Sequence, residues 1–199
     1  VLDDSSVIEN SPGAVVGNLS TTDIDAGDTH TYFVGDPRFE VLNGQLKLKP
    51  MELIDFEIET AINVTITSID SQGAPFSQTV VLNITAINDN APSVAPVQAF
   101  AVFGDVSDGA LIGTLNATDA DTGTTFSGWT IIGGNTDAIF AIDSNTGVLS
   151  VNDSTKLDFE STSSHTLSIV FSDGIQNSAP GAIQVTVNVD IVSPVPAAA

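Results

Sequence analysis

The two halves of this sequence repeat one pattern, and this repetition constrains the fold more than any other feature. Three segments of the first half return in the second half in the same order. They are VVGNLSTTDIDAGD (Val15–Asp28) with LIGTLNATDADTGT (Leu111–Thr124), ELIDFE (Glu52–Glu57) with TKLDFE (Thr155–Glu160), and ITSIDSQG (Ile66–Gly73) with IVFSDGIQ (Ile169–Gln176). The chain is therefore expected to contain two tandem units of about 100 residues each.

Each unit is predicted to be built from β-strands. Apolar and polar residues alternate through most of the chain, whereas helical periodicity is nearly absent. Asn43-Gly44 lies between two alternating runs, which is the pattern of a two-residue hairpin. About seven short strands per unit, with turn signals between them, indicate an all-β fold of two tandem β-sandwiches. We place the first unit at residues 1–90 and the second at 91–199, with 191–199 as a linker or tail that suggests excision from a longer protein.

The charge of the chain excludes several kinds of partner. The sequence has 25 Asp and Glu residues against 4 Lys and Arg residues, a formal net charge of −21. Such a chain repels the phosphates of nucleic acids and of anionic membranes, and no apolar stretch approaches the roughly 20 residues of a membrane span. Its acidic surface is consistent with solubility, tolerance of high salt or binding of divalent cations. The positions of the acids must distinguish these three.

Several acids recur as pairs two positions apart. Residues at this spacing in extended backbone face the same side, so two carboxylates can share one cation. Calcium requires about six to eight oxygen ligands, so each pair would supply only part of a site. An EF-hand is excluded, because the twelfth position counted from Asp119 is Thr130 rather than glutamate. The pairs are Asp55 with Glu57, Asp119 with Asp121, and Asp158 with Glu160.

The joint between the two copies also carries oxygen ligands. A β-type run ends there in Asn88-Asp89-Asn90, and Pro92 follows after one alanine. Asn and Asp are ordinary turn residues. Three oxygen-bearing side chains in succession between two units, however, could be shared by both units. The proline restricts the conformational freedom of the chain that follows them.

These motifs, taken in order, resemble tandem cadherin repeats, in particular the cadherin-like repeats of secreted bacterial surface proteins. The resemblance implies two Greek-key, immunoglobulin-like sandwiches in an elongated arrangement. It covers almost the whole chain. The first copy matches the family motifs at Glu9, at Asp23 and Asp25, at Asp55 and Glu57, at Asp70, and at the linker Asn88-Asp89-Asn90-Ala91-Pro92, and the second copy at Asp119, Asp121, Asp158, Glu160 and Asp173.

The resemblance implies that calcium ions bind at the junction of the two repeats. Three ions are expected there, and they would hold the two sandwiches as a stiff rod that loosens when calcium is removed. The implied side-chain ligands are Glu9, Asp55, Glu57, Asn88, Asp89, Asp119, Asp121 and Asp173. The backbone carbonyls of Ile87, Asn90 and Thr125 would complete the coordination shells.

The outer ends of the two copies carry further acids. Asp23, Asp25 and Asp70 could hold one ion at the far end of the first copy. The corresponding set in the second copy is Asp105, Asp158 and Glu160, which we expect to be weakly metallated or empty. Two departures from the family pattern support this, because Asp105 replaces the opening glutamate and no Asn-Asp-Asn follows Asp190.

The expected function is that of a calcium-rigidified adhesion or spacer module at the cell surface, in the matrix or in a biofilm. The protein is expected to be extracellular and of bacterial origin. The alternative is a calcium-dependent, lectin-like module that binds polysaccharide. The partner would be a polysaccharide or another cadherin-like domain.

The residues that could support other functions are few. Trp129 and Tyr32 are the candidates for a sugar-binding platform, although Trp129 aligns with Phe33 and is expected to lie in the core. No carbohydrate site is located by the sequence. An enzyme is not expected, because His30 and His165 do not recur at matching positions and no nucleophile has a histidine at an informative spacing.

Overall fold

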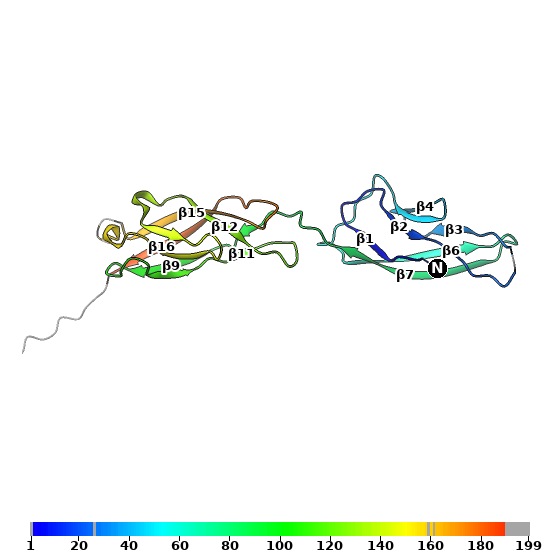
Figure 1. The fold of residues 1–199 in the computed structure, drawn as a ribbon, viewed down its shortest axis with the longest axis horizontal. Coiled ribbons are helices and arrows are strands. Elements are labelled where there is room, and N and C mark those ends of the chain that lie inside the picture. The colour runs from blue at the N-terminus through cyan, green and yellow to red at the C-terminus, as the bar shows by residue number, and fades with distance from the viewer. Residues whose placement is uncertain (1, 26, 159, 161, 190–199) are drawn as a thin grey trace, which may run out of the picture. The chain divides into compact units, whose positions relative to one another are not determined.

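The computed structural model describes residues 2–25, 27–158, 160 and 162–189. The proposed tail at 191–199 lies outside the described residues. The chain divides into two compact units, Val1–Ile87 (unit 1) and Asn88–Ala199 (unit 2). Both are built from strands, as Figure 1 shows, and the predicted all-β sandwich fold is confirmed.

Unit 1 contains two sheets that pack on one core. The first sheet has the order β1-β7-β6-β3 and the second the order β2-β5-β4. Strand β1 pairs with β7 in parallel, and the other pairs are antiparallel. The strands are β1 (Ser6–Ile8), β2 (Val15–Asn18), β3 (Thr31–Val34), β4 (Phe39–Leu42), β5 (Gln45–Leu48), β6 (Ala61–Ile69) and β7 (Pro75–Thr85).

The core of unit 1 follows from the alternation that the sequence shows. Val64 of β6 and Leu82 of β7 face Leu46 and Leu48 of β5, and all four side chains are fully buried. The predicted hairpin joins β4 to β5. Asn43 and Gly44 both have positive φ values, 54° and 74°, which is what a tight two-residue hairpin turn requires.

Unit 2 repeats this architecture with two small additions. Its sheets have the orders β12-β15-β16-β9 and β10-β14-β13, and β8 forms a short ladder with β11. The strands are β8 (Ser93–Val94), β9 (Ala99–Phe103), β10 (Leu111–Thr114), β11 (Ala117–Thr118), β12 (Ser127–Gly133), β13 (Phe140–Ile142), β14 (Val148–Val151), β15 (Ser164–Ser172) and β16 (Gly181–Asn188). Two 3₁₀ turns, η1 (Thr136–Ala138) and η2 (Ser154–Lys156), lie in its loops.

The core of unit 2 is aromatic at one end. Trp129 is buried and stacks on Phe171, with ring centroids 4.1 Å apart, and Phe126 meets the edge of the same ring at 5.4 Å. This confirms the expected core position of Trp129. The equivalence with Phe33 is wrong, because Phe33 is 54% exposed and its neighbour Tyr32 faces inward.

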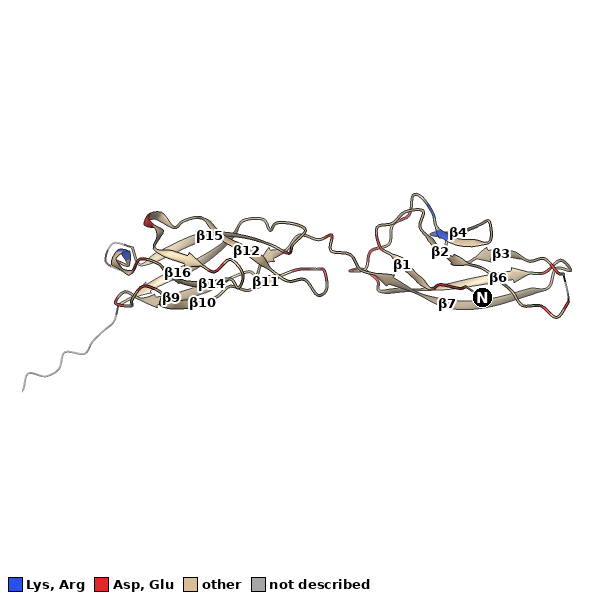
Figure 2. Cartoon of the chain, viewed as in Figure 1, with Lys and Arg blue, Asp and Glu red and all other residues tan. Residues whose placement is uncertain are grey.

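The acids are concentrated in the loops. Among the described residues, Glu40 in β4 is the one Asp or Glu that falls within a strand. Figure 2 shows the acidic positions in red on the connecting segments, with the strands largely tan. An acidic surface that served only solubility would also use the outward positions of strands. The loop placement therefore favours specific acidic sites.

Asp143 stabilises the turn between β13 and β14. Its Oδ1 accepts hydrogen bonds from the Thr146 hydroxyl (2.9 Å) and from the backbone N–H groups of Thr146 (2.8 Å) and Asn145 (3.0 Å). These bonds, that of the Thr146 hydroxyl first, hold the pKa of Asp143 below its usual range. The carboxylate form is thus favoured in the folded chain.

We expect acid to remove this contribution to stability. A group whose pKa is lowered by folding stabilises the native state fully above its unfolded pKa, which is about 4 for Asp. This stabilisation is lost as the pH falls through the lower pKa of the folded state. Between about pH 5 and pH 2, the Asp143→Asn variant should therefore lose less stability than the wild type. Denaturant unfolding in chelator, followed by the fluorescence of the single tryptophan, Trp129, measures this in unit 2. Equal losses in the two proteins would contradict the prediction.

Candidate metal centre

Glu9 is a buried carboxylate that ties two loops of unit 1 together. The residue follows β1 and is 0% exposed. Its Oε2 accepts a hydrogen bond from the N–H of Phe56 (2.6 Å), and its Oε1 accepts one from the N–H of Ile87 (2.7 Å). Among the described residues, no Lys or Arg forms an ion pair with Glu9. A buried negative charge with only neutral donors is a favourable place for a cation.

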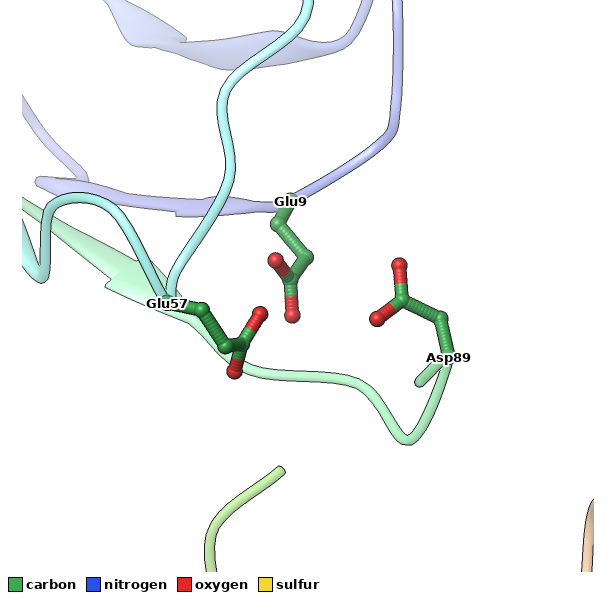
Figure 3. Close-up of side chains that lie close together, drawn as sticks. All are labelled: Glu9, Glu57 and Asp89. Carbon is green, nitrogen blue, oxygen red and sulfur yellow. The ribbon is translucent and has the colours of Figure 1, made fainter. Parts of the chain in front are cut away.

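Two further carboxylates meet Glu9. Glu57 and Asp89 each place one oxygen within 4.8 Å of it and of one another. Figure 3 shows the three carboxyl groups pointing toward a common centre. At about 4 Å, each pair of like charges costs about 1 kcal/mol even in bulk water, and more where water is excluded. A divalent cation at the centre would convert this repulsion into attraction.

Asp55 lies in the same loop as Glu57 and also shapes it. Its Oδ1 accepts hydrogen bonds from the backbone N–H groups of Glu57 (2.9 Å) and Ile58 (3.2 Å), which closes the turn. These bonds fix the position of Glu57 beside Glu9. Asp55 itself is outside the three-carboxylate group.

Unit 2 contains an acidic group of its own. Asp119, Asp121 and Asp173 each offer an oxygen within 4.8 Å of the others. Asp121 and Asp173 are buried, at 5% and 7% exposed. Asp119 and Asp121 meet in a loop and not in the extended backbone that the spacing assumed, and the N–H of Asp121 donates to Asp119 Oδ1 (3.1 Å).

The carboxylate oxygens of this group differ in how many hydrogen-bond donors contact them. Asp173 Oδ1 accepts hydrogen bonds from the N–H groups of Gln176 (2.6 Å) and Ile175 (2.7 Å), and the bond from Gln176 is the main cause of its lowered pKa. The other group member, Asp119, has a buried oxygen, Oδ2, with no hydrogen-bond partner among the described residues. A buried carboxylate oxygen without a donor is costly. A metal ion would satisfy it.

The segment Asn88-Asp89-Asn90 is attached to this group. Asn90 donates its backbone N–H to Asp121 Oδ2 (2.8 Å) and its side-chain amide to Asp121 Oδ1 (2.9 Å). Gln176 donates its amide to the carbonyl of Asp89 (2.7 Å). The linker predicted to be shared is thus held to the acidic loops of unit 2 by its backbone as well as by its side chains.

The side chain of Asn88 lies beside the carboxylates of unit 2. In one orientation of its amide, the oxygen faces only acceptors and the nitrogen only donors. With the amide reversed, its nitrogen would instead donate to Asp173 Oδ2 (3.0 Å) and Asp121 Oδ2 (3.2 Å). Asn88, Asp121 and Asp173 therefore converge in either orientation. The donor set is made entirely of oxygen, which suits calcium.

A third group lies at the far end of unit 1 and includes a residue that sequence reasoning missed. Asp23, Asp28 and Asp70 meet within 4.8 Å, whereas Asp25 is outside the group and donates its N–H to Asp23 Oδ1 (3.1 Å). Asp28 Oδ2 is buried and has no hydrogen-bond partner among the described residues. Asp28 aligns with Thr124 of the second copy, so comparison of the two copies gave no signal for it.

The remaining predicted positions form no comparable group. Among the described residues, Asp105, Asp158 and Glu160 do not meet as a set of three carboxylates. Asp158 Oδ1 accepts the N–H of Glu160 (2.9 Å). Thr125 lies in the loop between β11 and β12 that also carries Asp119 and Asp121.

The candidates for other functions are engaged elsewhere. Trp129, with 4% exposure, presents no platform to a sugar. His30 lies 3.1 Å from an oxygen of Asp23, and His165 packs against the ring of Phe140, with burial lowering its pKa. Neither histidine bonds to a Ser or Thr hydroxyl among the described residues. Nothing in this arrangement supports nucleophilic catalysis or favours the lectin alternative.

Comparisons with known proteins relate these two sandwiches and their oxygen-rich loops to cadherin repeats. Residues 99–190 match the Cadherin domain family. Human Protocadherin Fat 4 is 30% identical over 197 residues, which cover 94% of this chain and 4% of that protein. The chain thus spans a small fraction of this relative.

Solved structures show the same fold. Chicken VE-cadherin EC1-2 has a TM-score of 0.70 at 20% identity, covering 94% of this chain and 98% of that one. Protocadherin Gamma B2 extracellular cadherin domains 1-5 has a TM-score of 0.68 at 26% identity, covering 93% of this chain and 38% of that one.

Together these findings support cadherin-like repeats. The relatives are animal proteins, and they lend no support to a bacterial origin. Within the described part of the chain, no helix has the length and apolarity to cross a membrane.

Proposed function

We propose that this chain is a calcium-binding adhesion or spacer module in which ions held between the two repeats set the stiffness of the pair. The observation that carries the proposal is the group Asp119, Asp121 and Asp173, in which Asp121 and Asp173 are buried and the buried Asp119 Oδ2 has no hydrogen-bond partner among the described residues. A cation would satisfy the free oxygen and offset the repulsion among the three carboxylates. Calcium is the cation that takes six to eight oxygens in adaptable geometry.

The linker is what would make the ions common to both repeats. Asn88 and Asn90 contact the carboxylates of unit 2, whereas Asp89 joins Glu9 and Glu57. An ion bound by either set therefore constrains the same three linker residues. The proposed ligands are the side chains of Glu9, Asp55, Glu57, Asn88, Asp89, Asp119, Asp121 and Asp173 and the carbonyls of Ile87, Asn90 and Thr125.

A further ion is proposed at the far end of unit 1. Asp23, Asp28 and Asp70 supply three carboxylates, and the buried Asp28 Oδ2 supports the assignment. Asp105, Asp158 and Glu160 are expected to bind calcium weakly at most. The partner of the module would be another cadherin-like domain, because the relatives are adhesion proteins of that class.

We expect the Asp89→Ala variant to bind calcium with an affinity about 10- to 100-fold lower than the wild type at its tightest sites, since a carboxylate ligand is lost. Isothermal titration calorimetry measures this. Glu40→Gln removes one charge from a strand outside every acidic group and should titrate like the wild type. Unchanged affinity in Asp89→Ala would contradict the assignment of Asp89.

Small-angle scattering tests the mechanical part of the proposal. Calcium should narrow the distribution of particle dimensions of the wild type, and chelator should broaden it again. Asp89→Ala should require more calcium for the same change. A wild-type profile that does not respond to calcium would overturn the stiffening role even if calorimetry detects binding.

A further inference from the structure

Unit 1 contains a cavity that its counterpart in unit 2 has filled. The cavity has a volume of about 450 Å³ and lies at the end of the sandwich that carries Asp23 and Asp70. This volume is within the range of about 300–1,000 Å³ that is typical of small-molecule sites. Its apolar walls include Leu19, Ile66 and Val80.

The repeat explains why the space exists. When the copies are aligned on Asp70 and Asp173, Ser68 of β6 occupies the position of Phe171 of β15. Ser68 pairs across the ladder with Tyr32, whereas Phe171 stacks on Trp129. Unit 1 thus has a serine and a tyrosine where unit 2 has a phenylalanine and a tryptophan. The missing side-chain volume is the cavity.

The apolar wall reaches the surface at Phe76. In β7, Leu82 and Ile84 are buried, and the alternation places Phe76 on the same face of the strand. Phe76 lines the cavity and is nevertheless 64% exposed. A large aromatic side chain on the inner face of a sandwich is normally covered. Here it leaves an apolar opening that a ligand can reach.

The base of the cavity is polar and neutral. Thr21 Oγ1 lies 2.9 Å from Ser68 Oγ and 3.2 Å from the hydroxyl of Tyr32. These three hydroxyl groups satisfy one another, so the base does not demand a charged ligand. The apolar walls above it, and not these hydroxyls, favour an aromatic or aliphatic group.

The rim of the cavity is negative. Asp23 and Asp70 line it, and the one basic side chain among the lining residues is that of His30, which contacts Asp23 at 3.1 Å. None of the four Lys and Arg residues of the chain lines the cavity. The charge at this rim therefore favours a cation over an anion.

We propose that this cavity binds a small organic cation, namely a primary ammonium group attached to an apolar body. The ammonium would bind at Asp23 and Asp70, and the apolar body would lie between Leu19, Ile66 and Val80. A sugar fits less well, because the aliphatic walls offer no partners to its hydroxyl groups. The site lies wholly within unit 1 and shares Asp23 and Asp70 with the ion proposed at this end of the unit, so calcium and the ammonium would compete for these carboxylates.

The proposal is tested in chelator with three probes of one shape. 2-Phenylethylammonium, 2-phenylethanol and 3-phenylpropanoate carry positive, zero and negative charge, and NMR titration of the backbone amides of unit 1 gives their affinities. We expect the ammonium to bind about tenfold more tightly than the alcohol, because its hydrogen bonds to carboxylates are charge-assisted. The carboxylate should bind most weakly. Equal affinities for all three, or no binding of the ammonium, would overturn the proposal.

Two variants locate the site. Ser68→Phe copies the residue of unit 2 into the cavity and should abolish binding, whereas Thr67→Phe places the same ring on the opposite face of β6 and should not. If Ser68→Phe does not fold, the Asp23→Asn variant tests the assignment of the site. It should remove the preference for the ammonium over the alcohol while leaving the alcohol unaffected. A folded Ser68→Phe that still binds, or an Asp23→Asn that keeps the preference, would refute the assignment.

Discussion

Replacing Asp121 with asparagine is expected to lower the calcium affinity of the chain by about 100-fold or more, since even residues that only support a metal ligand contribute about 10- to 100-fold. Asp121 is buried, it belongs to the group with Asp119 and Asp173, and both its oxygens contact Asn90. The substitution keeps the shape of the side chain and removes its charge. In calcium the variant should unfold at a lower temperature than the wild type, and in chelator the two should be similar, because the loss of a hydrogen bond is offset by weaker repulsion.

The matched control is Asp137→Asn in η1. It removes the same charge from unit 2 at a position outside every acidic group, and its positive φ of 64° suits asparagine. Thermal unfolding with and without calcium, combined with calorimetry, distinguishes the two variants. If Asp121→Asn and Asp137→Asn respond to calcium alike, the acidic group of unit 2 is not a calcium site.

Replacing Phe171 with alanine should destabilise unit 2 by about 3–5 kcal/mol, the cost of truncating a buried aromatic side chain. Phe171 is 1% exposed, and its ring contacts both Trp129 and Phe126. Because a domain has only about 5–15 kcal/mol of stability, this single change should bring unit 2 close to unfolding. Denaturant titration followed by Trp129 fluorescence gives the midpoint for this unit.

Phe33→Ala serves as the comparison for a phenylalanine on the outer face. Phe33 is 54% exposed, and its truncation should cost about 0.5 kcal/mol or less. The buried cores of the two units share no residue, so amide exchange in β6 and β7 of unit 1 should not change in Phe171→Ala. Because Phe33 lies in unit 1 and Trp129 in unit 2, the Trp129 midpoint of Phe33→Ala should equal that of the wild type, and amide exchange in β6 and β7 measures its cost. A Trp129 midpoint in Phe171→Ala equal to that of the wild type would show that the aromatic stack does not support the core.

Most of the fold could be predicted from local pattern. The Asn43-Gly44 hairpin has a chemical signature of its own, and the strands of each unit alternate with period two. The internal repeat of the sequence predicted that the chain has two units. The register of Trp129 could not be predicted, because β12 has irregular pairing with β15 between Ser127 and Thr130, and an ungapped alignment therefore shifts by one residue.

The acidic groups could be predicted in outline only. Pairs at a spacing of two identify Asp119 and Asp121 because a short loop keeps them on one side. Asp28 meets Asp23 and Asp70 only in the folded chain, and the aligned position in the second copy is Thr124, so no local pattern signals it. The contact between Gln176 and the carbonyl of Asp89 joins residues 87 positions apart, so it depends on the folded unit.

The attachment of the linker to unit 2 has a thermodynamic consequence. Asn90 and the carbonyl of Asp89 are fixed by hydrogen bonds that need no metal. Part of the coordination sphere is therefore preorganised, so the linker loses less conformational entropy when an ion binds. Substitutions of Gln176 would reduce affinity entropically, although this residue never touches the metal.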